Sequence, residues 1–212
     1  MSAYKTLLRP ASDAFIVNRS RFIGYASPVS TEAEALAFLE EIRRKHRDAT
    51  HNCYAYTLGA NMGVMRYSDD GEPGGTAGLP MMEVIKKREV CDCCVVVTRY
   101  FGGVLLGAGG LVRAYSHGCS IGLDAARIVV MEESEQLLCE VAYHLWDRVQ
   151  HSLRTLPVKL LSTEFTSAVI FTLLTRLTDS EAVQRELTRL TNGQAEILSD
   201  GVSFRAWETD TK

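Results

Sequence analysis

One segment limits the possible folds of this 212-residue chain more than any other. From Cys93 to Arg99 the sequence reads as a continuous apolar strand, with Val95, Val96 and Val97 at its centre. A strand with one face in water alternates apolar and polar residues, whereas an unbroken apolar strand is covered on both faces. The segment therefore predicts the central strand of a buried sheet.

Strand-like and helix-like segments alternate on both sides of this strand. Thr31 precedes Glu34 by three residues, the spacing of a capping box that opens a helix. That helix ends in the basic cluster 43–47, which either opposes the helix dipole or contacts nucleic acid. The other elements expected here are strands at 21–26, 51–58 and 65–68, a helix from Thr76 to Arg88, and a helix that opens in the glycine-rich loop 102–110.

A domain boundary is expected at the acidic segment 132–134, which reads as a linker after a strand-like end at 129–131. It divides the chain into an N-terminal domain, residues 1–131, and a C-terminal domain, residues 132–212. The second domain has the pattern β-α-β-β-α-β, which is typical of a ferredoxin-like domain. Its expected elements are strands at 137–143, 158–164 and 168–174, helices through 145–153 and 178–190, and two short strands at 195–198 and 202–206. The predicted fold class is α+β with two domains.

Composition is typical of a soluble, cytoplasmic, globular protein. Apolar residues make up 46% of the chain and charged residues 23%, both close to the average. No apolar run is long enough to cross a membrane, and the N-terminus has no secretory signal. We therefore expect no membrane partner. The six cysteines are unevenly spaced, and we expect reduced core residues rather than disulfides or a zinc site.

The charges of the two halves differ. The net charge of −3 excludes a chain that is polybasic throughout. Residues 132–212 contain 8 Lys and Arg against 13 Asp and Glu, whereas residues 1–131 contain 15 against 13. The N-terminal domain is therefore the candidate for contact with an anionic polymer.

Two glycine-rich loops, each before an expected helix, are candidate anion-binding sites. Helix N-termini present free N–H groups, and glycines allow close approach of the backbone to a ligand. Neither loop matches a P-loop, and the second lacks the third glycine of a dinucleotide fingerprint. An anion would therefore bind in another mode. The candidate ligand-binding residues of the loops are Gly74, Gly75, Thr76, Gly102, Gly103, Gly109 and Gly110.

Carboxylates and an imidazole are further candidates for a ligand site. Asp69, Asp70 and Glu72 offer the oxygens that Mg²⁺ prefers, or they form an exposed turn. His51 is either a general base or a structural residue. Cys53 lies two residues further on the same face, but nothing in the sequence activates its thiol. We expect no catalytic residue, no resident metal and no cofactor beyond a weak case for Mg²⁺.

Arg99, Tyr100 and Arg113 are candidates for contact with nucleic acid. Arginine forms bidentate contacts with phosphate, and tyrosine stacks on bases. The alternative is that Arg99 pairs with a local acid while Tyr100 and Phe101 pack between the domains.

Three blocks of the sequence resemble the signatures of the IMPACT family, in particular its bacterial YigZ-like members. Together they fall within residues 15–130, in the order found in that family. The blocks are RYFGGVLLGAGGLVRAY from Arg99, DDGEPGGTAGLP from Asp69, and ATHNCYA from Ala49.

This resemblance implies a fold for each domain. The N-terminal domain is expected to be similar to the second domain of ribosomal protein S-five, an α/β sandwich. The C-terminal domain is expected to be similar to the last, ferredoxin-like domain of elongation factor G. Eukaryotic members of the family regulate translation, and the resemblance to translation proteins suggests RNA or the ribosome as a partner.

The leading hypothesis is an RNA-binding or ribosome-associated protein linked to translation regulation, without catalysis. A small-molecule enzyme or phosphate-ligand binder is the first alternative, with the carboxylate loop and the glycine loops as its site. A module that binds a protein partner is the second.

Overall fold

Two units, each with its own hydrophobic core, make up residues 3–208, the part of the chain that the computed structural model describes. The N-terminal unit contains Tyr4–Val130 and the end of the chain from Ala206, and the C-terminal unit contains Met131–Arg205. Each unit is built on an antiparallel sheet with helices packed against it. The protein is therefore an α+β protein with two domains.

The sheet of the N-terminal unit has five antiparallel strands in the order β2-β3-β6-β4-β5. These strands are β2 (Ala11–Val17), β3 (Ser20–Pro28), β4 (His51–Leu58), β5 (Val64–Ser68) and β6 (Cys93–Tyr100). The apolar strand β6 occupies the centre of the sheet, and all its residues from Cys93 to Arg99 are buried. The prediction of a central strand is confirmed.

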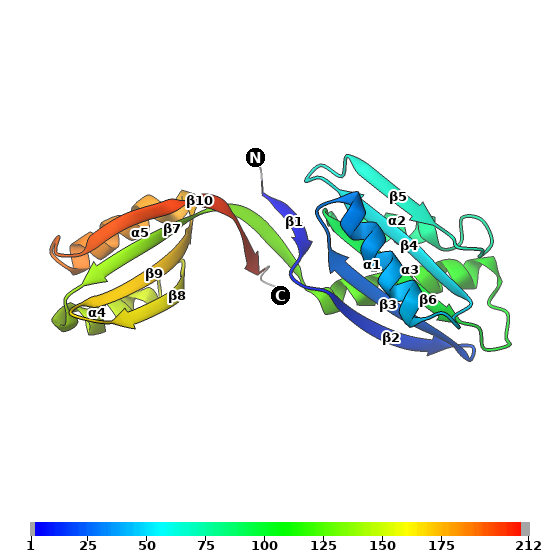
Figure 1. Cartoon of the computed structure of the whole chain (residues 1–212). Coiled ribbons are helices and arrows are strands. Elements are labelled where there is room, and N and C mark those ends of the chain that lie inside the picture. Colours follow the sequence, from blue (N-terminus) through cyan, green and yellow to red (C-terminus); the bar gives the residue numbers. More distant parts are fainter. Residues whose placement is uncertain (1–2, 209–212) are drawn as a thin grey trace. The chain divides into compact units, whose positions relative to one another are not determined.

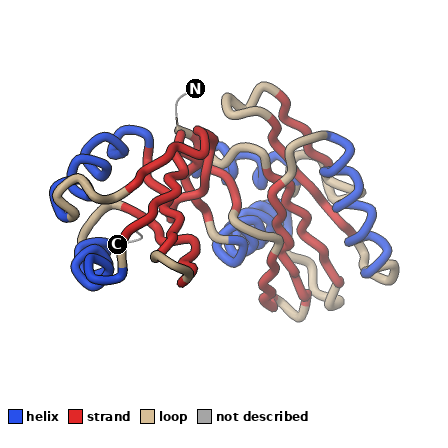
Figure 2. Tube along the Cα trace, turned by 60° about the vertical axis from the view of Figure 1, so that its left-hand side comes forward, coloured by secondary structure: helices blue, strands red, loops and turns tan. Residues whose placement is uncertain are grey.

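Helices cover both faces of this sheet (Figure 1, Figure 2). Helix α1 (Glu32–Lys45) packs on one face, where its Leu39 and Ile42 join a core with Val96 of β6. Helices α2 (Gly78–Arg88) and α3 (Gly107–Ala126) pack on the other. The α1 N-terminus is capped as predicted, because the Thr31 side chain accepts a hydrogen bond from the Glu34 N–H at 3.2 Å.

Helix α3 lies unusually close to β3 because glycines line the contact. A Cβ atom added to Gly24 of β3 would lie 1.9 Å from the carbonyl oxygen of Gly118 on α3. A Cβ atom added to Gly122 would lie 3.1 Å from the Gly24 backbone. Only residues without side chains permit this approach, and it places the N-terminal end of α3 beside the ends of the strands.

The C-terminal unit has the predicted order β-α-β-β-α-β. In its sheet β9 lies between β7 and β8, and β10 also pairs with β7. Strand β7 begins within the N-terminal unit, and its further neighbour is the short strand β1 (Tyr4–Leu7) of that same unit. The elements of this part are β7 (Ile128–Val141), α4 (Tyr143–Leu153), β8 (Val158–Phe165), β9 (Val169–Arg176), α5 (Leu177–Leu190) and β10 (Glu196–Glu208).

Two expectations from the sequence are wrong in this region. The acidic segment 132–134 is not a linker but part of the continuous strand β7. The negative charge of Glu132 is balanced because its carboxylate pairs with Arg176 of β9. Ser134 of the same segment is fully buried. The two short strands expected near the C-terminus are one strand, β10, in which Gly201 has a φ of 108°. Residues 3–208 contain no helix of the length and apolarity needed to cross a membrane.

Candidate ligand-binding pocket

A pocket of about 430 Å³ opens at one end of the N-terminal sheet. Strand β6 ends here and β4 begins here, so that Arg99 and His51 are direct neighbours across the two strands. The loops after β5 and β6 complete the walls. The polar lining residues are Thr50, His51, Glu72 and Arg99, and the apolar ones include Pro73, Phe101, Leu105, Leu106 and Leu111. A mostly apolar cavity with a few convergent polar groups is the usual form of a small-ligand site.

A buried carboxylate organises the pocket floor. Glu72 Oε1 accepts hydrogen bonds from Arg99 Nη1 at 2.6 Å and from the Tyr115 hydroxyl at 2.7 Å. The Glu72 side chain is only 3% exposed. Burial raises the pKa of Tyr115 far above its usual value, with Cys53 and Glu72 adding to the effect, so its hydroxyl remains a donor. Within residues 3–208, Glu72 Oε2 accepts no hydrogen bond.

Arg99 is fixed by more than its ion pair. Its guanidinium lies between the rings of Phe22 and Phe101, at 5.5 and 5.3 Å from their centroids. Arg99 Nε is the one buried side-chain nitrogen or oxygen in the described part of the chain without a hydrogen-bond partner. A buried donor left unpaired costs about 1–3 kcal/mol, so this position calls for an acceptor.

His51 is held in one tautomer. Its Nδ1 lies 2.8 Å from the carbonyl oxygen of Asp70. A carbonyl only accepts, so Nδ1 carries the proton and Nε2 of the neutral ring has a free lone pair. Nε2 lies 3.8 Å from Glu72 Oε1. The Asp70 carbonyl thus fixes the orientation of the His51 ring at the pocket wall.

The two aspartates of the same loop have structural tasks. The Asp69 carboxylate accepts hydrogen bonds from the backbone N–H groups of Gly75, Ala77 and Gly78. Asp70 accepts one from the backbone N–H of Asn52 at 2.7 Å and pairs with Arg43. Neither aspartate lines the pocket. Among residues 3–208 no group of three or more His, Cys, Asp and Glu side chains is arranged to hold a metal, so the structure lends no support to the Mg²⁺ alternative.

The Cys53 thiol is a buried donor. Burial raises its pKa to about 12, and its Sγ donates to the Asp69 carbonyl oxygen at 2.9 Å. A thiol with such a pKa stays protonated at neutral pH and is a poor nucleophile.

The other sequence candidates surround the pocket. Tyr100 does not line it, because its hydroxyl bonds His46 at 2.8 Å and Asp48 at 3.1 Å. Arg113 is exposed on α3 and lines a neighbouring cavity of about 360 Å³. The Thr76 hydroxyl is buried and donates to the Pro73 carbonyl.

The glycines predicted from the sequence also differ in whether they line the pocket. Gly107 and Ala108 of α3 reach the pocket lining, but Gly109, Gly110, Gly74 and Gly75 do not. Gly102 has a packing role, since an added Cβ would lie 2.1 Å from the Arg19 backbone. An added Cβ on Gly103 would meet nothing within 4 Å.

Exposed cations lie on several segments of this unit, at the turn after β2, at the start of β3, at the end of α1 and on α3. We call them the cationic rim: Arg19, Arg21, Arg44, Lys45, Arg47 and Arg113. Arg21 pairs with Tyr100 in the strand register, and the turn at Arg19 lies against Gly102. In the described chain no rim residue forms an ion pair with a carboxylate. The sequence pointed to 43–47 and Arg113, whereas Arg19 and Arg21 join the rim only through the pairing of β3 with β6.

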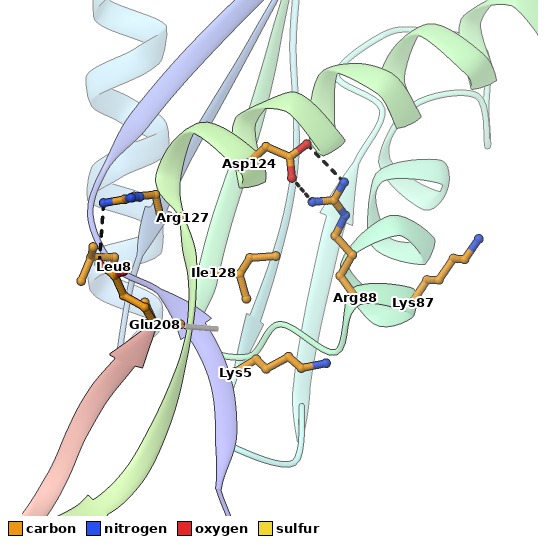
Figure 3. Close-up of a pocket in the computed structure, with 9 residues that line it drawn as sticks. Lys5, Leu8, Lys87, Arg88, Asp124, Arg127, Ile128 and Glu208 are labelled. Carbon is orange, nitrogen blue, oxygen red and sulfur yellow. Dashed lines mark hydrogen bonds and ion pairs between the residues drawn. The ribbon is translucent and has the colours of Figure 1, made fainter. Parts of the chain in front are cut away.

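A larger cavity, of about 670 Å³, lies elsewhere on the N-terminal unit (Figure 3). Its cations are mostly neutralised by acids. Arg88 pairs with Asp124, Lys5 with Glu89 at 2.8 Å, and Arg127 with Glu208 at 3.8 Å. This cavity therefore offers a weaker field to an anion than the rim does.

Comparison with known proteins identifies the families and relatives to which the chain is similar. A family model for the Impact N-terminal domain matches residues 18–123, and one for the domain of unknown function DUF1949 matches residues 139–194. The chain is 39% identical to the IMPACT family member YvyE of Bacillus subtilis, covering 96% of this chain and 94% of that protein. It is 30% identical to the IMPACT family member YigZ of Escherichia coli, covering 91% and 97%.

A eukaryotic relative matches over part of its length, and a solved structure matches over nearly all of its length. The protein IMPACT homolog of Dictyostelium discoideum is 36% identical over 103 residues, which make up 47% of this chain and 28% of that protein. A crystal structure of a hypothetical protein superposes with a TM-score of 0.60 at 28% identity, covering 95% of this chain and 98% of that one.

Proposed function

The chain belongs to the IMPACT family, and on that premise we propose that it is an RNA-binding protein linked to the regulation of translation. It contacts RNA with the cationic rim of its N-terminal unit. Catalysis forms no part of this proposal.

The cationic rim carries the proposal. Each of its six side chains is exposed and lacks a carboxylate partner in residues 3–208. Several arginines elsewhere in the described chain have such partners, for example Arg176 with Glu132 and Arg189 with Glu186. Unpaired cations on one domain produce the positive field that attracts a phosphate backbone.

The pocket inside the rim favours RNA whose bases are unstacked. Proteins recognise single-stranded RNA by drawing individual bases into apolar or aromatic sites while cations hold the backbone. Phe101 and Leu105 stand exposed at the pocket, next to the rim. Double-stranded DNA would offer the rim its phosphates but would leave this pocket empty.

The test is the binding of a fluorescein-labelled, unstructured 12-nucleotide RNA to the purified full chain, measured by anisotropy across a salt series. We expect affinity to fall steeply between about 50 and 200 mM salt, because binding releases counterions. Arg21→Ala and Arg113→Ala should each weaken binding and lower the slope of log affinity against log salt by about 1.

Arg154→Ala is the matched control, because Arg154 is an exposed arginine of the C-terminal unit. It should leave both affinity and slope unchanged. Binding that is absent at low salt, or that responds equally to all three substitutions, would contradict the proposal.

A further inference from the structure

We infer that the chain self-associates through the free edge of strand β2. Two copies form a symmetric dimer in which the β2 strands pair and the two N-terminal sheets become one continuous sheet. The partner is a second copy of this chain. This interaction goes beyond the proposed RNA binding and does not depend on it.

Strand β2 offers an open and regular edge. It is the outermost strand of the N-terminal sheet (Figure 1), and within residues 3–208 it pairs only with β3. That pairing runs through seven consecutive residues without a shift in register. The outer strand of the C-terminal sheet, β8, instead has a register shift between Leu160 and Ser162. Bulges of that kind protect a sheet edge from pairing with another chain, and the β2 edge has no such shift.

Main-chain groups on the outer side of β2 are available to an added strand. Every second residue of an antiparallel strand turns its N–H and C=O away from the neighbouring strand. Ala14 is one of these residues, because its N–H donates to the Asp13 carboxylate at 2.7 Å. By the same alternation the main-chain groups of Ser12 and Ile16 point outward. The Ile16 side chain is 73% exposed, so this edge also presents apolar surface.

A cavity of about 360 Å³ beside this edge calls for an acidic side chain. Its lining comes from β2, α3 and the loops next to them, and it includes Phe15, Arg113 and His117. Phe15 packs edge-on against His117, with 4.6 Å between the ring centroids. Arg113 and His117 are exposed and form no ion pair within residues 3–208. A carboxylate on an added strand next to Phe15 would give both side chains a charged acceptor.

A second copy of β2 supplies this carboxylate. When the two-fold axis passes through Ala14, each Ala14 lies opposite the other and all seven residues of each strand pair. Asp13 of one copy then lies opposite Phe15 of the other copy, on the face of the sheet that α3 covers. Its carboxylate reaches the cavity lined by Arg113 and His117. The symmetry of the dimer repeats this contact on the other side of the axis.

The neighbouring registers are less favourable. An axis through Asp13 would place the two Asp13 side chains opposite each other, and like charges directly opposite destabilise a sheet. An axis through Phe15 would pair fewer residues. On the face that α3 does not cover, the register through Ala14 places Ser12 opposite Ile16, and neither side chain is charged. The sequence of β2 is therefore compatible with its own copy in one register.

Asp13 distinguishes this arrangement from an edge that is merely protected. In a single copy its carboxylate covers the Ala14 N–H, and charged residues on edge strands commonly prevent pairing. In the dimer the Ala14 N–H bonds the Ala14 carbonyl of the other copy, and the carboxylate turns to Arg113. Removal of the carboxylate should therefore strengthen self-association if Asp13 only protects the edge, and weaken it if Asp13 binds the second copy.

Sedimentation velocity of the full chain over a concentration series, without RNA, tests the inference. A strand edge of seven residues buries less surface than a standard interface, so we expect a weak dimer with a dissociation constant of about 10–100 µM. Asp13→Ala should raise this constant several-fold. High salt should raise it as well, because an exposed ion pair is screened.

A charge exchange tests the predicted contact itself. Asp13→Arg and Arg113→Asp should each raise the dissociation constant at least about tenfold, because like charges then meet in the interface. The double variant restores opposite charges and should recover the dimer. Asp147→Arg is the matched control, because it makes the same change in net charge at an exposed residue of the C-terminal unit. It should dimerise as the wild type does.

A proline tests the main-chain pairing. Ala14→Pro removes the N–H at the two-fold axis from both copies and should abolish the dimer. Proline is tolerated on edge strands where the N–H faces solvent, and thermal unfolding checks that the variant is folded. Ala14→Ser keeps the N–H and should dimerise like the wild type.

Each contrary result overturns the inference. A chain that stays monomeric at every concentration has no such interface. A dimer that Asp13→Ala strengthens, or that survives both Asp13→Arg and Ala14→Pro, forms through another surface. None of these results bears on RNA affinity, which has its own test, so the two proposals fail separately. Because Arg113 also belongs to the cationic rim, RNA and the second copy exclude each other at that residue.

Discussion

Asp69 shows how a single carboxylate shapes the candidate pocket without lining it. Helix α2 has no side chain that caps its N-terminus from the adjacent position. Asp69 does this from eight and nine residues away, by accepting the N–H groups of Ala77 and Gly78 at 3.0 and 2.8 Å. The loop that carries Glu72 is thereby closed on itself, so the position of Glu72 depends on Asp69.

We expect Asp69→Asn to destabilise the protein by about 1 kcal/mol at neutral pH, since hydrogen bonds to a charged acceptor are stronger than those to a neutral one. Burial opposes ionisation of Asp69, but the N–H groups of Gly75, Gly78 and Ala77 outweigh it and lower its pKa. A lowered pKa gives stability that is complete above the unfolded-state value and is lost as pH falls through the folded-state value.

Urea unfolding at pH 7 and at pH 3 measures this effect. The difference between wild type and Asp69→Asn should shrink at the lower pH. Glu41→Gln, at an exposed residue of α1, should stay within about 0.5 kcal/mol of wild type. A difference that grows on acidification would refute the role given to Asp69.

The sequence named part of the pocket and missed part of it. His51, Glu72 and Arg99 stood out because their residue types carry chemistry. Tyr115 did not, although its hydroxyl bonds Glu72 across 43 residues of chain. Such a contact depends on how α3 lies on the sheet, and no local pattern encodes it. For Arg99 the sequence left both a phosphate contact and an ion pair open, and the structure shows the ion pair.

At the scale of elements, the contact of α3 with β3 sets the position of the pocket. Glycines at the crossing bring the helix close enough for its N-terminal end to reach the pocket lining. The addition of one methyl group at this contact should therefore destabilise the whole N-terminal unit.

Gly24→Ala should destabilise the protein by about 1–3 kcal/mol or more, because its methyl group would overlap the Gly118 carbonyl and packed elements adjust poorly. Gly109→Ala on the same helix is the matched control. Its methyl group would meet only the Arg113 side chain, at 3.6 Å, and helix propensity predicts a gain of up to about 1 kcal/mol. Thermal unfolding of both variants measures these changes in stability. Equal changes would show that α3 does not pack tightly against β3.

Elements with a strong period were predictable, and the first two strands of the chain were not. The sequence placed β4, β6, α1 and the hairpin of β8 with β9 close to their observed bounds. It missed β1 and β2. Most β2 residues are exposed, so the strand lacks the apolar alternation that marks a strand in sequence, and its pairing with β3 alone defines it.

At the scale of the molecule, the two units have cores that share no residue. Phe171 and Leu173 belong to the core of the C-terminal unit, whereas Met81 and Tyr115 belong to that of the N-terminal unit. A substitution that destabilises one core should therefore destabilise mainly the unit that contains it.

Phe171→Ala should destabilise the C-terminal unit by about 3–5 kcal/mol, because the side chain is almost fully buried. If the cationic rim is the contact surface, RNA affinity at low temperature should not change. Calorimetry measures the first effect and anisotropy the second. Phe171→Leu keeps most of the side-chain volume and should show a smaller loss of stability. A fall in RNA affinity that parallels the loss of stability in these two variants would show that RNA binds the C-terminal unit instead.

We expect the thiols of the six cysteines to react poorly with labelling reagents. All are buried and unpaired, and burial raises the pKa of every one, to about 12 for Cys53, Cys93 and Cys139. Maleimide reagents need an accessible thiolate. A cysteine introduced at the exposed position Leu105 would therefore accept a dye while the native thiols stay unlabelled, and fluorescence could follow occupancy of the pocket in the otherwise unaltered chain.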